Sequence, residues 1–196
     1  MINFVLILIA YGIGLIPSAY ILSKLFKQVD ITVTGTGNVG TMNTIVNVGV
    51  LPGILTLASD VGKGLLVVWL SITLGTVESI PVLALFFLIL AHNFNPFLDF
   101  KGGKGFGNLA GGLILLSPLT IPAIIALQTV LLILFKIPKV TAGFATLFFP
   151  IVFYSQTSNL TLLIGSFPIT IAIFSKHMDN FKTYIENWRI VHHHND

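Results

Sequence analysis

Three polar segments, residues 28–48, 92–105 and 175–196, hold almost all the side chains of this chain that could do chemistry. They are rich in Gly, Asn, Lys and His, and each adjoins an apolar run. Glycine-lined backbone N–H groups and lysine ammonium groups bind anions, and a histidine can exchange a proton near neutral pH. We therefore expect a site that handles phosphate or a similar anion.

The first segment contains a cluster of three glycines, Gly35-Thr36-Gly37-Asn38-Val39-Gly40, followed by Asn43. The cluster fits G-x-G-x-x-G, and Asp60 follows about 20 residues later, as in dinucleotide-binding folds. That fingerprint requires a strand and a βαβ unit, whereas here an apolar span follows at once and contains Asp60. The property that survives is a nest of backbone N–H groups converging on an anion. A flexible loop between spans is the alternative interpretation.

The second segment begins at His92 and ends in the run Lys101-Gly102-Gly103-Lys104-Gly105. An apolar run starts at Phe106, so a helix N-terminus with its partial positive charge is expected beside Lys104. The run is not a Walker A loop, because Gly105 stands where Ser or Thr must follow the lysine. We expect an anion site here. The alternative is that both lysines only anchor a span at the lipid headgroups.

The third segment contains His177 between lysines and, three residues later, Asn180. A histidine in this setting could bind phosphate or accept a proton, or it could be an interfacial anchor. Three consecutive histidines at 192–194 are weak evidence for a metal. Because the chain also has no cysteine, we expect neither a metal site nor a cofactor.

Apolar helices must position these segments. Hydrophobic residues make up 55% of the chain and charged residues 9%, with a mean hydropathy of +0.95. A soluble domain carries about a quarter charged residues, so lipid is the expected solvent. The net charge of +3 is too small to indicate nucleic acid. We expect an all-α integral membrane protein with one transmembrane domain over residues 1–196.

Apolar runs occur at Ile2–Leu25, Gly49–Leu74, Ile80–Ala91, Phe106–Leu116, Leu119–Phe135, Val140–Tyr154 and Leu160–Phe174. Several are shorter than the ~20 residues that cross a bilayer, so we expect a bundle of about seven short transmembrane helices. If every run crosses once, all Lys and Arg residues except Lys63 fall in loops on one side. That side is cytoplasmic by the positive-inside rule, with the N-terminus outside and the C-terminus inside.

Two features lie within the runs themselves. Asp60 and Lys63 are three residues apart and share a helix face, and each charge at a helix centre costs about 2.5–3.5 kcal/mol. We expect them to form a structural intramembrane pair. Gly103, Gly107 and Gly111 recur every fourth residue, which predicts close helix packing.

In this order, the segments resemble the bacterial acyl-phosphate:glycerol-3-phosphate acyltransferases of the PlsY type over nearly the full length. The motifs that carry the resemblance are Gly14 through Tyr20, Gly35 through Asn43, Asp60-x-x-Lys63-Gly64, His92 through Gly105 and His177 through Asn180. The resemblance implies a seven-helix bundle in the bacterial cell membrane with its site at the cytoplasmic face. It also implies transfer of a fatty acyl group from acyl phosphate to the 1-hydroxyl of glycerol 3-phosphate, giving lysophosphatidate.

Acyl phosphate is already activated, so positioning and preorganised charge can lower most of the barrier without a nucleophilic side chain. On this interpretation Lys104, His177 and Asn180 are catalytic, and the hydroxyl proton goes to His177 or to a substrate phosphate oxygen. The residues expected to bind phosphate or substrate are Gly35, Thr36, Gly37, Asn38, Gly40, Asn43, His92, Lys101, Gly102, Gly103 and Gly105. The expected partners are acyl phosphate, glycerol 3-phosphate or a related phosphorylated alcohol, and membrane lipid.

The chain departs from the family pattern at several positions. Met42 and Val46 stand where the family usually has Thr and Arg, and an arginine binds phosphate bidentately in a way that a hydrophobe cannot. The other departures are Thr36 for Ser, Asn108 for Thr, Thr183 for Arg and Arg189 for Glu. Two hypotheses follow. The chain is an acyltransferase, with weakened or altered acceptor recognition, or a paralogue that binds a phosphorylated lipid intermediate without catalysis.

Overall fold

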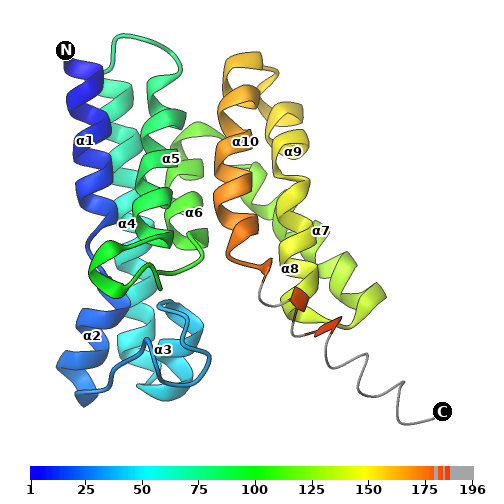
Figure 1. Ribbon diagram of the computed structural model, residues 1–196. Coiled ribbons are helices and arrows are strands. Elements are labelled where there is room, and N and C mark those ends of the chain that lie inside the picture. The colour runs from blue at the N-terminus through cyan, green and yellow to red at the C-terminus, as the bar shows by residue number, and fades with distance from the viewer. Residues whose placement is uncertain (179–180, 183, 186–196) are drawn as a thin grey trace.

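The computed structural model describes residues 1–178, 181–182 and 184–185, and all the regular structure within them is helical (Figure 1). The elements are α1 (Ile2–Gly14), α2 (Ser18–Lys27), α3 (Thr41–Asn47), α4 (Val50–Leu74), α5 (Ile80–Asn93), the 3₁₀ turn η1 (Pro96–Leu98), α6 (Phe106–Leu116), α7 (Thr120–Phe135), α8 (Pro138–Leu147), α9 (Phe149–Thr157) and α10 (Leu160–Ser175). The all-α expectation is confirmed. Asn180, Thr183, Arg189 and residues 192–194 lie outside the described residues.

The apolar runs become helices long or apolar enough for a membrane. Ile2–Lys27, Val50–Leu74 and Ile80–Leu98 are each long enough to cross, and the pair Val140–Leu147 and Phe149–Thr157, bent by 42°, counts as a fourth candidate. Three shorter apolar helices complete the set: Phe106–Leu116, Thr120–Phe135 and Leu160–Ser175. The chain is a multi-pass membrane protein. The number of complete crossings and the orientation of the termini stay predictions.

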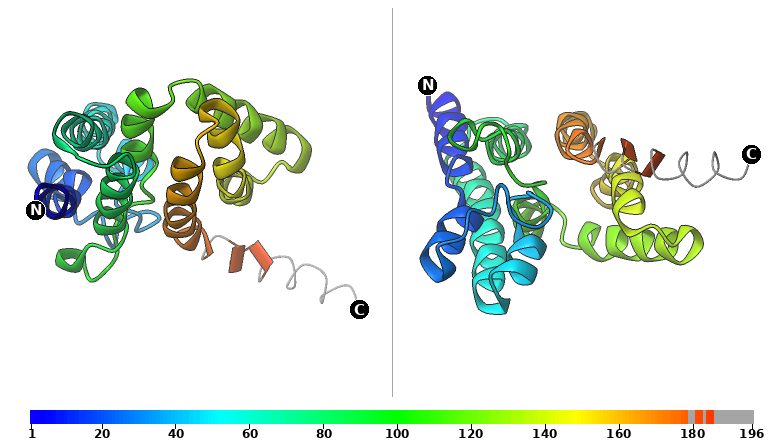
Figure 2. Two further views of the ribbon diagram at one scale, coloured as in Figure 1. Left: turned by 90° about the horizontal axis from the view of Figure 1, so that it is seen from above. Right: turned by 60° about the horizontal axis from the view of Figure 1, so that its bottom comes forward.

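The helices form two groups that meet along α5 and α10 (Figures 1 and 2). Helices α1, α4, α5 and α6 pack together, and α7, α8, α9 and α10 form the second group. One apolar core connects the groups, and its most buried side chains include Val68, Leu85, Leu88, Phe153, Ile169 and Ile173. The other faces of these helices carry many exposed large hydrophobic side chains, as expected for surfaces that face lipid.

The first apolar run is broken into α1 and α2 at Pro17, a division that the sequence did not predict. Proline has no N–H and clashes with the preceding turn, so it interrupts a continuous helix. A break in a membrane leaves carbonyl groups that need internal partners. The Leu15 carbonyl accepts a hydrogen bond from Asn95 Nδ2 at 2.8 Å, and the Ile16 carbonyl accepts one from Lys63 Nζ at 2.7 Å.

The second polar loop, residues 94–105, lies beside α4 rather than beyond its end (Figure 1). Helix α4 has 25 residues and is about 37 Å long, whereas α5 with 14 residues is about 21 Å long. Helix α6 has 11 residues, or about 16 Å. Helices α5 and α6 both pack against α4, so the loop between them lies level with a middle part of α4 and does not reach the residues where α4 begins. At this level the loop meets the first polar segment.

The predicted packing through small residues is confirmed for α4 and α6. A Cβ at Gly107 would lie 2.8 Å from the Cβ of Asp60, and one at Gly111 would collide with the carbonyl oxygen of Val61. Gly103 is a correction to the expected stripe, because α6 begins only at Phe106 and Gly103 contacts other elements. Gly64 of α4 completes the contact, since a Cβ there would collide with the backbone of α6.

Gly64→Ala is expected to destabilise the protein by about 1–3 kcal/mol, because its methyl group would force α4 and α6 apart. Gly62→Ala is the matched control on the same helix, since a Cβ there has nothing within 4 Å. Ala at that position should be neutral or stabilising by up to about 1 kcal/mol. Thermal unfolding of the two variants in one detergent measures the difference. Equal unfolding temperatures would contradict the close α4–α6 contact.

Candidate functional site

Asn43 organises the first polar loop. Its Nδ2 donates to the carbonyl groups of Thr34 at 2.9 Å and Asn38 at 3.0 Å, and its Oδ1 accepts from the backbone N–H of Thr36 at 3.1 Å. Asn47 Nδ2 also donates to Asn43 Oδ1, at 2.9 Å. Because the amide of Asn43 is buried and committed to the loop, its place in the site is that of a scaffold.

The glycine cluster uses several of its N–H groups internally. Gly37 N–H donates to the Thr34 carbonyl at 3.1 Å and Gly40 N–H to the Asn38 carbonyl at 3.1 Å, in addition to the Thr36 N–H bound by Asn43. These three groups do not converge on open space, which corrects the nest interpretation for them. The cluster has two polar side chains, of which Thr36 is exposed and Asn38 is half-buried.

The second loop packs tightly on the end of α5 and on the first loop. A Cβ at Gly103 would collide with the His92 ring and lie 2.8 Å from the Val39 carbonyl oxygen. A Cβ at Gly102 would collide with the carbonyl oxygen of His92. Gly103 therefore allows the first and second loops to touch, and Gly102 lets the second loop pack on the end of α5, which the sequence could not show. Gly105 takes a left-handed backbone, with φ of +79°, immediately before α6.

The expected pair of Asp60 and Lys63 is confirmed. Lys63 Nζ lies 3.1 Å from Asp60 Oδ1, and both side chains are buried. The Nδ1 atom of His92 lies 3.9 Å from the same carboxylate oxygen. The ion pair thus reaches the break after α1 through Lys63 and lies beside His92, next to the second loop, through Asp60.

His177 follows α10 and is 1% exposed. Its Nδ1 lies 3.0 Å from the Ile173 carbonyl oxygen, and its ring meets Phe106 of α6 edge-on at 5.4 Å between centroids. A carbonyl oxygen can only accept, so Nδ1 carries the hydrogen and the neutral ring keeps its lone pair on Nε2. Burial, with a smaller contribution from the nearby charge of Lys104, lowers the pKa of His177 to about 4. The imidazole is therefore neutral at pH 7.

The two lysines of the second loop differ. Lys101 is exposed, whereas Lys104 is half-buried at the start of α6 and near enough to His177 for its charge to act on the ring. Lys104 of the first group of helices and His177 of the second therefore lie within electrostatic range of each other. His92, Gly102 and Gly103 line a hollow together with Val39 of the first loop. Asn180 lies outside the described residues.

A small hollow lies where the loops meet. Its lining residues are Pro17, Ser18, Ala19, Val39, His92, Asn95, Leu98, Gly102 and Gly103. Ser18 and Asn95 were not among the predicted site residues, although both lie in segments with polar motifs. Met42 and Val46 are outside this lining and are 69% and 76% exposed on α3. The apolar replacements therefore alter an exposed face of α3 and not the wall of the hollow.

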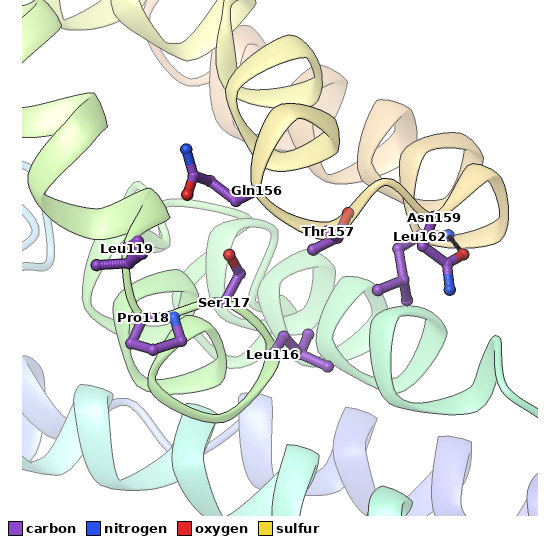
Figure 3. Close-up of a pocket in the computed structure, with 8 residues that line it drawn as sticks. All are labelled: Leu116, Ser117, Pro118, Leu119, Gln156, Thr157, Asn159 and Leu162. Carbon is purple, nitrogen blue, oxygen red and sulfur yellow. Dashed lines mark hydrogen bonds between the residues drawn. The ribbon is translucent and has the colours of Figure 1, made fainter.

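A larger hollow of about 370 Å³ lies at the other ends of α6 and α10 (Figure 3). Its lining residues are Leu116, Ser117, Pro118, Leu119, Gln156, Thr157, Asn159 and Leu162. None of these side chains is charged, and none of the predicted site residues is among them. An anion has no cation to meet there, so the candidate site stays with the loops at the opposite helix ends.

The family assignment comes from sequence comparison. The family model described as glycerol-3-phosphate acyltransferase matches residues 4–187. The chain belongs to the glycerol-3-phosphate acyltransferase family. Glycerol-3-phosphate acyltransferase 2 of Dehalococcoides mccartyi (strain ATCC BAA-2266 / KCTC 15142 / 195) is 38% identical over 169 residues, which are 84% of this chain and 80% of that protein. The Bacillus subtilis (strain 168) glycerol-3-phosphate acyltransferase is 34% identical over 180 residues, 92% of each chain.

Solved structures support the same fold. The crystal structure of PlsY (YgiH), an integral membrane glycerol 3-phosphate acyltransferase, in its glycerol 3-phosphate form has a TM-score of 0.83 with this chain. The two are 22% identical, and the match covers 94% of this chain and 92% of that one. The lysophosphatidic acid form has a TM-score of 0.82. The resemblance stated from the motifs is therefore confirmed at the level of family and fold.

The lowered pKa of His177 predicts a pH dependence of stability. Between pH 6.5 and about 4 the unfolded chain protonates this histidine and the folded chain does not. The unfolded state then binds more protons, so this group makes stability fall as the pH drops through that window. His177→Asn should show a smaller loss of unfolding temperature between pH 6.5 and pH 4.5 than the natural chain. Identical pH dependences would show that the ring is not held neutral.

Proposed function

We propose that this family member transfers a fatty acyl group from acyl phosphate to the 1-hydroxyl of glycerol 3-phosphate, releasing phosphate and forming lysophosphatidate. Membership of the family carries the acyltransferase activity and the glycerol 3-phosphate acceptor. To this we add three proposals: that the donor is acyl phosphate, that particular residues carry the reaction, and that the site is at the cytoplasmic face. Their main support is that Lys104, just before α6, is near enough to His177, just after α10, for its charge to act on the ring.

The reaction needs positioning more than a protein nucleophile. The acceptor hydroxyl oxygen attacks the acyl carbonyl carbon, a C–O bond forms, and the bond from that carbon to the phosphate oxygen breaks. Phosphate leaves with the electron pair, and it is a good leaving group because the negative charge is shared by several oxygens. The hydroxyl proton goes to His177 or to a phosphate oxygen. The protein has to hold two phosphates near one carbonyl, which orientation and fixed positive charge can do.

Lys104 and the start of α6 suit the donor phosphate. The lysine contributes a full positive charge, and the first turn of an 11-residue helix adds its partial charge. His177 suits the acceptor, because Nε2 of the neutral ring is free of the Nδ1 contact and can accept the hydroxyl hydrogen. We assign Asn180 to the acceptor as well, from its place in the motif. Gly102 and Gly103 let the second loop pack closely against His92.

The non-catalytic alternative rested on Met42 and Val46. The relatives described above carry the name of the enzyme, and the chain is 34–38% identical to them over most of its length. Both substitutions lie on an exposed face of α3, outside the hollow at His92. We therefore favour an active enzyme. Because Val46 stands where the family usually has a phosphate-binding arginine, we still expect a high Michaelis constant for glycerol 3-phosphate.

The donor assignment is tested with purified protein and radiolabelled glycerol 3-phosphate. Palmitoyl phosphate should support formation of labelled lysophosphatidate, and palmitoyl-CoA should not, since a thioester of CoA lacks the phosphate anhydride. The acceptor concentration is varied in the same assay to obtain its Michaelis constant. Transfer from the thioester at an equal rate would overturn the donor assignment, and no transfer from either donor would overturn the proposed activity.

Lys104→Ala is expected to weaken donor binding by roughly 10- to 150-fold, the range for hydrogen bonds to a charged group. Lys136→Ala is the matched control, because Lys136 is an exposed lysine at the end of α7. Donor affinity is measured for both variants at matched protein concentration by competition with a non-hydrolysable acyl phosphonate. Equal effects of the two substitutions would reduce Lys104 to a headgroup anchor.

A further inference from the structure

The second loop contains backbone strain next to the proposed donor site. Asp99 and Phe100 are consecutive and both left-handed, with φ of +50° and +61°. Aspartate tolerates this region, whereas a bulky aromatic residue rarely adopts it. Such conformations persist only where surrounding contacts hold them, and they cluster at functional sites. Lys101, Gly102, Gly103 and Lys104 follow Phe100 directly, so whatever holds Phe100 also sets the path of the chain toward Lys104.

Asn95 holds one side of this strained turn. Its carbonyl oxygen accepts from the Phe100 N–H at 2.9 Å, its Oδ1 accepts from the Phe97 N–H at 2.9 Å, and its Nδ2 donates to Leu15. The carbonyl of Phe100 accepts from Lys176 Nζ at 3.3 Å. The same ammonium group lies 5.3 Å from the centroid of the Phe94 ring. Lys176 therefore contacts the strained turn itself and the residue at the start of the loop.

Lys176 comes from the other group of helices, one residue after the end of α10 and one before His177. A second contact crosses the same boundary, where Asn93 Nδ2 donates to the Ala172 carbonyl at 2.9 Å. Two hydrogen bonds thus connect the C-terminal end of α10 to this part of the chain, one at the last residue of α5 and one at the strained turn.

We propose that Lys176 is a positioning residue that holds the strained turn at Phe100 and so sets the placement of Lys104 relative to His177. Only the expected effect of Lys176 on kcat rests on the acyl transfer proposed above. The contact between Lys176 and the turn can be measured without activity. Lys176 acts through the Phe100 carbonyl and need not touch a substrate. It was not among the residues that the motifs assigned to the site.

The direct test is hydrogen exchange of the full chain in detergent, followed by mass spectrometry of peptides covering residues 96–105. Lys176→Met keeps an unbranched side chain and removes the donor. Exchange in this loop should rise by about 2- to 10-fold, the factor for one ordinary net hydrogen bond. Lys176→Arg keeps a donor and a cation and should restore slow exchange. Lys27→Met, at an exposed lysine at the end of α2, is the matched control and should change nothing.

Kinetics separate positioning from direct phosphate binding. For a positioning role, Lys176→Met should lower kcat by about 10- to 100-fold, the loss expected from a small misplacement of reacting groups. Phe100→Gly removes the strain, so Lys176→Met should cost less in that background, a coupling that a double-mutant cycle reports. Unchanged exchange in Lys176→Met would overturn the proposal, as would a rise in Michaelis constant alone that is equal in both backgrounds. A natural chain without transfer activity would overturn the proposed function and leave the exchange result to decide the role of Lys176.

Discussion

The buried ion pair of Asp60 and Lys63 is the interaction on which the placement of the site depends. A charge inside a membrane is tolerated only with partners, and Lys63 has two, the Asp60 carboxylate and the Ile16 carbonyl. The second contact satisfies a backbone group freed where Pro17 breaks the first span. The pair thus stabilises the break between α1 and α2, which lies beside the continuous helix α4. Replacing either charge would leave the other one buried without its counter-ion, a large cost in a low-dielectric interior.

The same pair also connects the surrounding helices to the polar loops. Gly107 of α6 lies against Asp60, and His92 of α5 lies 3.9 Å from its carboxylate. Helices α5 and α6 therefore both lie beside this pair, and their short lengths bring the second loop back beside the first, where Gly103 meets Val39.

Residues of the site come from both groups of helices, so its geometry depends on how the groups are attached. Within the first group, the first and second loops touch through Val39 and Gly103. Across the groups, Asn93 binds α10 and His177 packs on Phe106. A neutral His177 follows from this burial, because desolvation disfavours the charged ring and the positive charge of Lys104 adds to the effect. The protonation state of the histidine is therefore a property of the assembled site.

The sequence by itself determined the membrane class, the positions of the apolar helices, the family and the Asp60–Lys63 pair, because composition, hydropathy and i,i+3 spacing are local properties. It did not determine the break at Pro17, the division of the expected run Val140–Tyr154 into α8 and α9, the separate helix α3, or the internal use of the glycine-loop N–H groups by Asn43 and its neighbours. It also did not reveal Asn95 and Lys176, whose partners Leu15 and Phe100 are 80 and 76 residues away in the chain. Only the tertiary structure decided these features, since a polar side chain in a membrane protein bonds to whichever backbone group the packing of other helices leaves open beside it.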